Sequence, residues 1–203
     1  MAPLERGRAF TIVESMTAAD NVDKRIGARI RAERESRGWS LTELAERSAV
    51  SRSMIHKIER GESSPTAALL GKLSGAFQLS MSTLIARAET REGRLLRKAE
   101  QPIWIDPQTG YERRHVSPKS ETPLDLVRIA LPAGAQVPMP ASAYAFVRQL
   151  VWVLEGELVM LEGGARHEMA AGDCLELGPP ADCAFVNESD APCVYAVVVL
   201  HTR

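Results

Sequence analysis

Hydrophobic residues recur every three or four positions between residues 22 and 88, and this spacing predicts a bundle of short helices. Ile26 and Ile30 lie one turn apart and predict a first helix that ends near Gly38. Four further helices are predicted between Ser40 and Ile85, separated by short polar segments. We therefore expect a five-helix domain over residues 22–88.

Helix-start signals sharpen the middle of this bundle. Ser40 and Glu43 form the pattern of a capping box, which predicts a second helix that runs to Ser48. Ser51 is a good N-cap for a third helix, which Gly61 would end. Two short helices joined by a tight turn are therefore expected in the centre of the domain.

The pattern changes after residue 101, where proline and glycine recur and the apolar runs become short. The runs that read as strands are Ile103–Ile105, Leu126–Leu131, Gln149–Leu154, Leu158–Leu161, Cys174–Leu177 and Tyr195–Leu200. Strands of this length, separated by turn residues, predict an antiparallel sandwich or barrel over residues 102–203. The expected fold class is therefore a multidomain α + β protein, with a helical bundle followed by an antiparallel β-barrel.

Two segments fall outside these domains. Residues 1–21 have no helical periodicity and are expected to form a flexible arm. Residues 89–101 are highly charged and are expected to form a linker, helical in character. Trp104 and Tyr111 flank a Pro-Gln-Thr-Gly turn and are expected to pack as strand residues.

Composition narrows the class of protein. The 203 residues are 45% hydrophobic and 25% charged, as in a soluble globular protein of two ordinary domains. No apolar run approaches the roughly 20 residues that span a bilayer, and no signal-peptide pattern opens the chain. The three cysteines do not form a disulfide framework, so we expect a cytoplasmic protein without membrane association.

The net charge of −1 hides an asymmetry between the two halves. Residues 1–98 carry 18 Lys and Arg against 12 Asp and Glu, whereas residues 99–203 carry 7 against 14. A basic half attracts phosphate through counterion release. The basic half is also the one that holds the two central helices.

The segment from Trp39 to Thr66 resembles the Xre/Cro-type helix-turn-helix family of transcriptional regulators. The matching positions are Leu44-Ala45, Val50-Ser51-Arg52, Ile58-Glu59-Arg60-Gly61 and Pro65. The resemblance extends over about residues 26–85 and implies that the third helix enters the major groove of DNA. It implies base-reading by Arg52, Ser53 and Lys57, with His56 at the margin. The backbone phosphates would be contacted by Thr42, Ser51 and Arg60.

One position departs from this family. The turn residue that is usually glycine is Ala49, so a left-handed backbone there would be strained. An all-helical interaction module with a solvated basic face remains the alternative to a DNA reader.

The second half resembles the cupin family of small β-barrels, which often hold a metal through histidines and a glutamate. The resemblance rests on the turn at Gly134, the run from Trp152 to Glu157, the Gly172-Asp173 turn and Asn187. The ligand positions fall on Pro140, Ser142, Gln149 and Cys183, and there is no histidine between His115 and His167. These residues are poor metal ligands, so we expect no metal, no cofactor and no enzymatic activity.

A barrel without metal can still enclose a ligand pocket. The residues expected to line an effector pocket are Tyr144, Arg148, Gln149, Trp152, Cys183 and Phe185. Cys183 could act as an oxidant sensor, but acidic residues flank it and a buried inert thiol is the favoured interpretation.

These observations predict a homodimeric regulator, more often a repressor in this family, that binds a double-stranded DNA operator and responds to a small effector. Dimerisation is expected largely through the barrel. Two alternatives stay open: a metalloenzyme that resembles the helix-turn-helix-plus-cupin epoxidase, and an antitoxin-like partner of a second protein.

Overall fold

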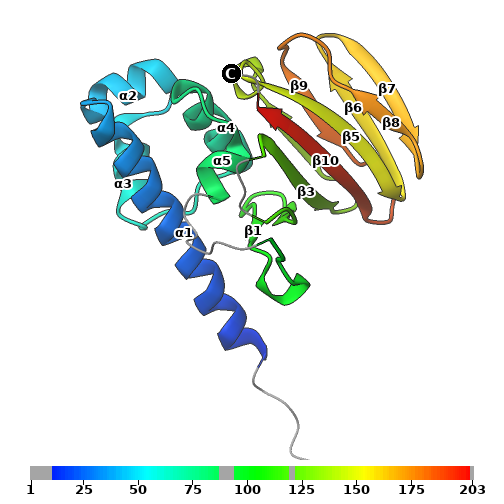
Figure 1. The fold of residues 1–203 in the computed structure, drawn as a ribbon, viewed down its shortest axis with the longest axis horizontal. Helices are drawn as coiled ribbons and strands as arrows, with labels where there is room; N and C mark the ends of the chain where they lie inside the picture. Colours follow the sequence, from blue (N-terminus) through cyan, green and yellow to red (C-terminus); the bar gives the residue numbers. More distant parts are fainter. Residues whose placement is uncertain (1–10, 87–93, 119–121, 202–203) are drawn as a thin grey trace, which may run out of the picture.

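The computed structural model describes residues 11–86, 94–118 and 122–201, and the chain forms a helical domain followed by a sheet domain (Figure 1). The helices of the first domain are α1 (Thr11–Ser36), α2 (Leu41–Ser48), α3 (Arg52–Glu59), α4 (Ala67–Ala76) and α5 (Met81–Ala86). Their buried core includes Ile30, Leu44, Ile55, Leu70 and Leu84. The expected five-helix domain is confirmed.

Helix α1 is longer than the sequence predicts. It begins at Thr11, so the second half of the expected N-terminal arm, residues 1–21, is helical, and residues 1–10 lie outside the described residues. In Figure 1 this end of α1 extends away from the remaining helices. A helix segment that extends away from the core needs no apolar stripe, which explains why hydrophobic periodicity missed it.

The sheet domain contains two antiparallel sheets. The strands are β1 (Ile103–Ile105), β2 (Glu112–His115), β3 (Leu124–Leu131), β4 (Gln136–Met139), β5 (Val147–Glu155), β6 (Glu157–Glu162), β7 (Ala165–Ala170), β8 (Cys174–Glu176), β9 (Cys183–Val186) and β10 (Cys193–His201). One sheet has the order β1-β2-β3-β10-β5-β8 and the other the order β4-β9-β6-β7. Among the described residues no strand pairing joins the sheets, so the expected closed barrel is instead a two-sheet sandwich.

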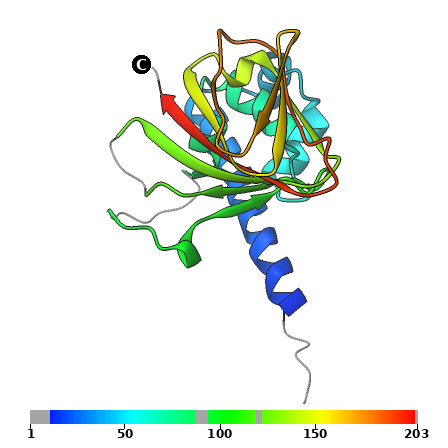
Figure 2. The same ribbon diagram turned by 90° about the vertical axis from the view of Figure 1, so that its right-hand side faces the viewer.

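Alternation along the strands fills the space between the sheets. In β5, Val151 and Val153 are buried, while Leu150 and Trp152 on the opposite face are 40% and 48% exposed. β10 supplies Tyr195, Val197 and Val199 to the interior. Figure 2 shows the sheet domain from the side opposite the helices.

The segment before the first strand also differs from expectation. Of the predicted helical linker, residues 94–97 have no helical structure and Lys98–Glu100 form one 3-10 turn, whereas residues 89–93 lie outside the described part. The following hairpin matches its prediction. Trp104 and Tyr111 are buried and pack edge to face, with ring centroids 6.2 Å apart.

The two domains pack closely against each other. Helix α4 places two glycines against the 3-10 turn η2 (Ala141–Ala143) of the sheet domain. A Cβ added at Gly75 would lie 2.7 Å from the backbone oxygen of Ser142, and one at Gly71 would lie 3.1 Å from Pro140 Cδ. These glycines allow α4 to approach the turn more closely than alanine would permit.

No helix in the described part of the chain has the length and apolar character needed to cross a membrane.

Candidate nucleic-acid interface and interior cavity

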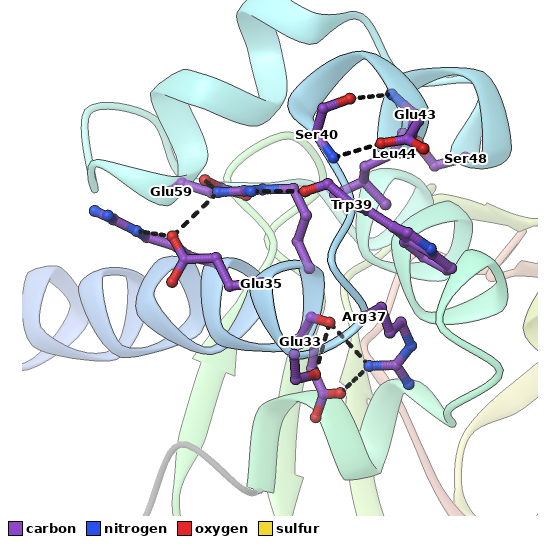
Figure 3. A network of polar contacts seen from close by, with 12 residues as sticks. Glu33, Glu35, Arg37, Trp39, Ser40, Glu43, Leu44, Ser48 and Glu59 are labelled. Carbon is purple, nitrogen blue, oxygen red and sulfur yellow. Dashed lines mark hydrogen bonds and ion pairs between the residues drawn. The ribbon is translucent and has the colours of Figure 1, made fainter.

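Helices α2 and α3 begin at the N-caps that the sequence predicts. Ser40 Oγ accepts from the Glu43 amide at 3.2 Å, and the Ser40 amide donates to Glu43 Oε2 at 2.7 Å, which completes the capping box drawn in Figure 3. This donation lowers the pKa of the Glu43 carboxyl. Ser51 Oγ accepts from the Met54 amide at 3.3 Å and begins α3.

The turn between these helices contains the expected strained residue. Ala49 has φ 51° and ψ 37°, in the left-handed region that glycine occupies more easily. This conformation ends α2 and lets Val50, which is buried, start the turn into α3. The backbone strain expected for alanine at this position is therefore confirmed.

Helix α3 has one buried face and one exposed polar face. Ile55 and Ile58 are fully buried against the bundle. The four predicted base-reading residues are all exposed: Arg52, Ser53, His56 and Lys57. Spacings of three and four residues bring these side chains to one side of the helix.

The three predicted phosphate contacts surround this face. Thr42 lies in the first turn of α2, and Ser51 precedes the first residue of α3. Both are exposed and lie at helix N-termini, where unsatisfied amides favour an anion. Arg60 is exposed and forms an ion pair with Glu62 at 2.6 Å.

A side-chain clamp that sequence reasoning missed holds α3 against α1. Arg34 in α1 donates to both carboxylate oxygens of Glu59, at 2.7 and 2.9 Å, and to the Trp39 carbonyl oxygen at 2.9 Å. The hydrogen bond to Glu59 raises the pKa of Arg34. In Figure 3 the dashed lines at Glu59 and at Trp39 mark these hydrogen bonds. A bidentate ion pair of this kind restricts the rotation of α3 relative to α1 as well as the distance between the two helices.

The backbones of α1 and α3 also touch. A Cβ at Gly27 would lie only 2.1 Å from the Ile58 carbonyl oxygen, so this contact requires glycine. Glycine inside a helix costs roughly 0.5–1 kcal/mol relative to alanine. The close crossing explains why the helix contains it, and the spacing between α1 and α3 is thereby fixed.

The interior of the sheet domain contains a small cavity of about 40 Å³. Three of the six residues predicted for an effector pocket line it: Tyr144, Gln149 and Phe185. The remaining lining residues were not predicted, and they include Met81, Tyr111 and Arg113. Met81 belongs to α5, so both domains form the cavity wall. Alternation from Tyr111 into β2 could have indicated Tyr111 and Arg113, because residues two apart in an extended segment share a face.

The other three predicted pocket residues lie elsewhere. Arg148 and Trp152 are on the outer face of β5, where Arg148 pairs with Glu176 at 3.2 Å. Cys183 is buried but is not part of the cavity wall, and its thiol lies 3.3 Å from the Ala181 carbonyl oxygen. Burial raises the pKa of this thiol to about 11, with Glu162 and Asp182 adding to the effect. A thiol with such a pKa is almost entirely protonated at neutral pH.

The donor set does not fit a cupin metal. Within residues 11–86, 94–118 and 122–201, no three His, Cys, Asp or Glu side chains gather closely enough to hold a metal ion. Of the four positions expected for ligands, Pro140 offers no side-chain donor, Gln149 lines the cavity and Cys183 does not.

The family comparison matches the helical domain. A family model described as helix-turn-helix matches residues 30–84. An uncharacterised HTH-type transcriptional regulator of Mycobacterium tuberculosis is 30% identical over 112 residues, which cover 49% of this chain and 80% of that protein. The HTH-type transcriptional regulator SutR of Escherichia coli is 33% identical over 99 residues, 46% of this chain and 56% of SutR. The chain thus spans little more than half the length of SutR.

One solved structure matches both domains. A transcriptional regulator of the HTH_3 family from Vibrio cholerae is 26% identical, with a TM-score of 0.74, and covers 90% of this chain and 99% of its own. A cupin domain from an XRE family transcriptional regulator of Enterobacter cloacae is 22% identical over 46% of this chain, with a TM-score of 0.43.

Proposed function

Because this chain belongs to the helix-turn-helix family of transcriptional regulators, we propose that it binds a DNA operator in a sequence-specific manner and represses transcription. The observation that carries the proposal is the exposed polar face of α3, which offers Arg52 and Lys57 beside Ser53 and His56. Arginine and lysine donate to guanine O6 and N7 in the major groove.

The rigid mounting of α3 supports this assignment. A recognition helix must hold its side chains in one register against the base edges. The Arg34–Glu59 clamp and the Gly27 crossing supply that restraint from α1. Thr42 and Ser51 are suited to phosphate contacts that set the register.

The proposal is tested by binding measurements on a duplex that the purified chain selects from a random library. Arg52→Ala and Lys57→Ala should each weaken binding by about 1–3 kcal/mol and relax the preference at one base pair. Arg166→Ala serves as the control, since Arg166 is an exposed arginine on β7 of the sheet domain. If both α3 variants bound the selected duplex like the Arg166 variant, α3 would not be the reading helix.

We further propose that the regulator is a homodimer formed through the outer face of the larger sheet. Four exposed apolar side chains share this face on adjacent strands: Leu124, Leu150, Trp152 and Leu200. An exposed apolar patch of this kind is typical of an interaction surface. Two recognition helices would then lie about 34 Å apart, one turn of DNA.

The dimer proposal is tested by the mass of the chain in solution. Trp152→Glu should convert a dimer to a monomer and weaken operator binding, whereas Leu95→Glu, at an exposed apolar residue outside the strands, should do neither. A wild-type chain that remains monomeric at micromolar concentration would refute the dimer.

The cavity supports regulation by a small effector, the remaining part of the proposed function. It lies between the cupin-like sheets and is partly walled by α5 of the DNA-binding domain. A ligand that binds better in one arrangement of the two domains shifts the population toward that arrangement.

A further inference from the structure

We infer that the interior cavity binds a small carboxylate on Arg113, and that Ser82 reports its occupancy to the DNA-binding domain. This inference rests on the proposed function, because it names the effector class and the route by which the effector acts. Four observations carry it: the burial of Arg113 without an ion-pair partner, the tyrosine hydroxyl groups of the region, the size of the cavity and the contact with Ser82.

Arg113 is a buried cation without an anionic partner. Its residue is only 7% exposed, and it lines the cavity. Among the ion pairs between described residues, none involves Arg113. Its guanidinium donates to the neutral hydroxyl of Ser82. A buried charge is costly unless it is paired, so this guanidinium favours an anion as its ligand.

Two carboxylates that act on the tyrosines of the cavity wall are already engaged. Asp106 accepts from the Gln108 amide at 2.9 Å and from the Thr109 hydroxyl at 3.1 Å. Glu162 accepts from the Gly178 amide at 2.7 Å. Neither is within ion-pairing distance of Arg113, so a bound anion would not compete with a protein carboxylate.

Two tyrosines line the same cavity as Arg113, and the third stacks on its wall. Tyr111 and Tyr144 line the cavity, and Tyr195 stacks on the lining residue Phe185 with ring centroids 5.4 Å apart. Burial raises the pKa of each tyrosine, so all three hydroxyls stay protonated and can donate. The Tyr195 hydroxyl has no hydrogen-bond partner. A guanidinium among hydroxyl donors is a setting for a carboxylate.

The size of the cavity limits the ligand. A water molecule needs about 10–15 Å³ of such space, and the cavity offers about 40 Å³. That space suits a carboxylate with a short apolar body, which would contact Met139, Val197 and Val199.

The same guanidinium joins the two domains. Ser82 lies in α5, next to Met81, which forms part of the cavity wall. A carboxylate that binds the Arg113 Nη2 group competes with Ser82 for this donor. Occupancy of the cavity therefore changes how α5 sits on the sheet domain, and α5 belongs to the bundle that holds α3.

The ligand is tested first without DNA. Acetate and pyruvate should raise the melting temperature of the full chain and shift the Arg113 Nε–H signal in NMR spectra, whereas neutral acetamide should do neither. Arg113→Met should weaken carboxylate binding tenfold or more, since it removes a charged hydrogen-bond partner. Arg166→Met, at the exposed arginine on β7, should leave binding unchanged.

Each result decides the ligand assignment. Equal binding of acetate by the wild-type and Arg113→Met chains would overturn it, as would absence of binding. Binding of inorganic phosphate in preference to both carboxylates would also overturn it. None of these measurements uses DNA, so they can succeed even if the proposed regulator function fails.

The coupling is tested with DNA. Carboxylate should change the affinity for the selected duplex by a factor of about 5 or more in the wild-type chain. Ser82→Ala should bind carboxylate at least as tightly, because a competitor for Arg113 is removed, but should reduce the coupling toward none. If Ser82→Ala retained the full coupling, Ser82 would not be the reporter.

Discussion

Each domain contains an arginine that is largely shielded from solvent, and the two differ in what surrounds the guanidinium. Arg34 in the helical domain meets both oxygens of Glu59 and the Trp39 carbonyl. Arg113 in the sheet domain meets the hydroxyl of Ser82 and a cavity. The first guanidinium has its charge balanced within the protein, whereas the second does not.

This difference separates a structural role from a binding role. A balanced buried ion pair fixes the geometry of its neighbours. Loss of one partner leaves the other charge buried and unpaired. An unbalanced buried cation contributes little to the fold and leaves its donors to a ligand. The predictions below test that separation through the stability and geometry of the two domains.

The largest effect is expected for Arg34→Met, which leaves the Glu59 carboxylate buried and alone. The free energy of unfolding should fall by about 3 kcal/mol in urea titrations of the full chain. Arg31→Met is the matched control, because Arg31 forms an exposed pair with Glu35 in the same helix and its loss should hardly change the free energy of unfolding. Equal losses would remove the structural role of Arg34.

The second largest effect is expected for Gly27→Ala. Helix propensity predicts that this change stabilises the chain, and we expect it to destabilise the chain instead. Propensity alone favours alanine by roughly 1 kcal/mol, but the new Cβ would meet the Ile58 carbonyl oxygen. We expect a net loss of about 1–3 kcal/mol, since overpacking forces α1 and α3 apart. Thermal unfolding measures it, with Ala28→Gly at an exposed position of α1 as the reference for the ordinary cost of glycine. A stabilised Gly27→Ala chain would contradict the close crossing.

Ala49→Gly should increase stability by about 0.5–1 kcal/mol. The left-handed conformation costs alanine about 1–2 kcal/mol, and the greater freedom of glycine in the unfolded chain returns part of the gain. Gln78 has φ 58°, so Gln78→Gly should behave in the same way. Chemical denaturation of both variants checks the prediction, and a loss at both positions would refute the strain.

The smallest effect is expected for Arg113→Met. Removal of an unpaired buried charge offsets the lost packing, so the free energy of unfolding should stay within about 0.5 kcal/mol of the wild-type value. Urea titration again measures it. A loss as large as that of Arg34→Met would mean that Arg113 is structural, and the contrast between the two arginines would disappear.

The helical domain follows from local signals, and most of it is predictable from the sequence. The capping box at Ser40, the N-cap at Ser51 and the inward Ile55 and Ile58 depend on residues within a few positions of one another. The exposed face of α3 follows from the same spacing. The early start of α1 does not, because that segment has no apolar periodicity to reveal it.

The cavity depends on residues far apart in the sequence, and half of its predicted wall lies elsewhere. Arg148 and Gln149 are neighbours on one strand, so their side chains must point to opposite faces, and only Gln149 points inward. Arg113 meets Ser82 from 31 residues away, across a domain boundary. No spacing rule along the chain connects these two positions.

The shared wall of the cavity has a consequence for modular engineering. The domains of a two-domain protein are often treated as interchangeable parts, but here α5 supplies Met81 to the cavity wall and Ser82 as the acceptor for Arg113. A chimera that joined residues 102–201 to a foreign DNA-binding head would lose one wall of the cavity and its partner for Arg113. The proposed ligand selectivity and the DNA-binding domain would therefore have to be transferred together.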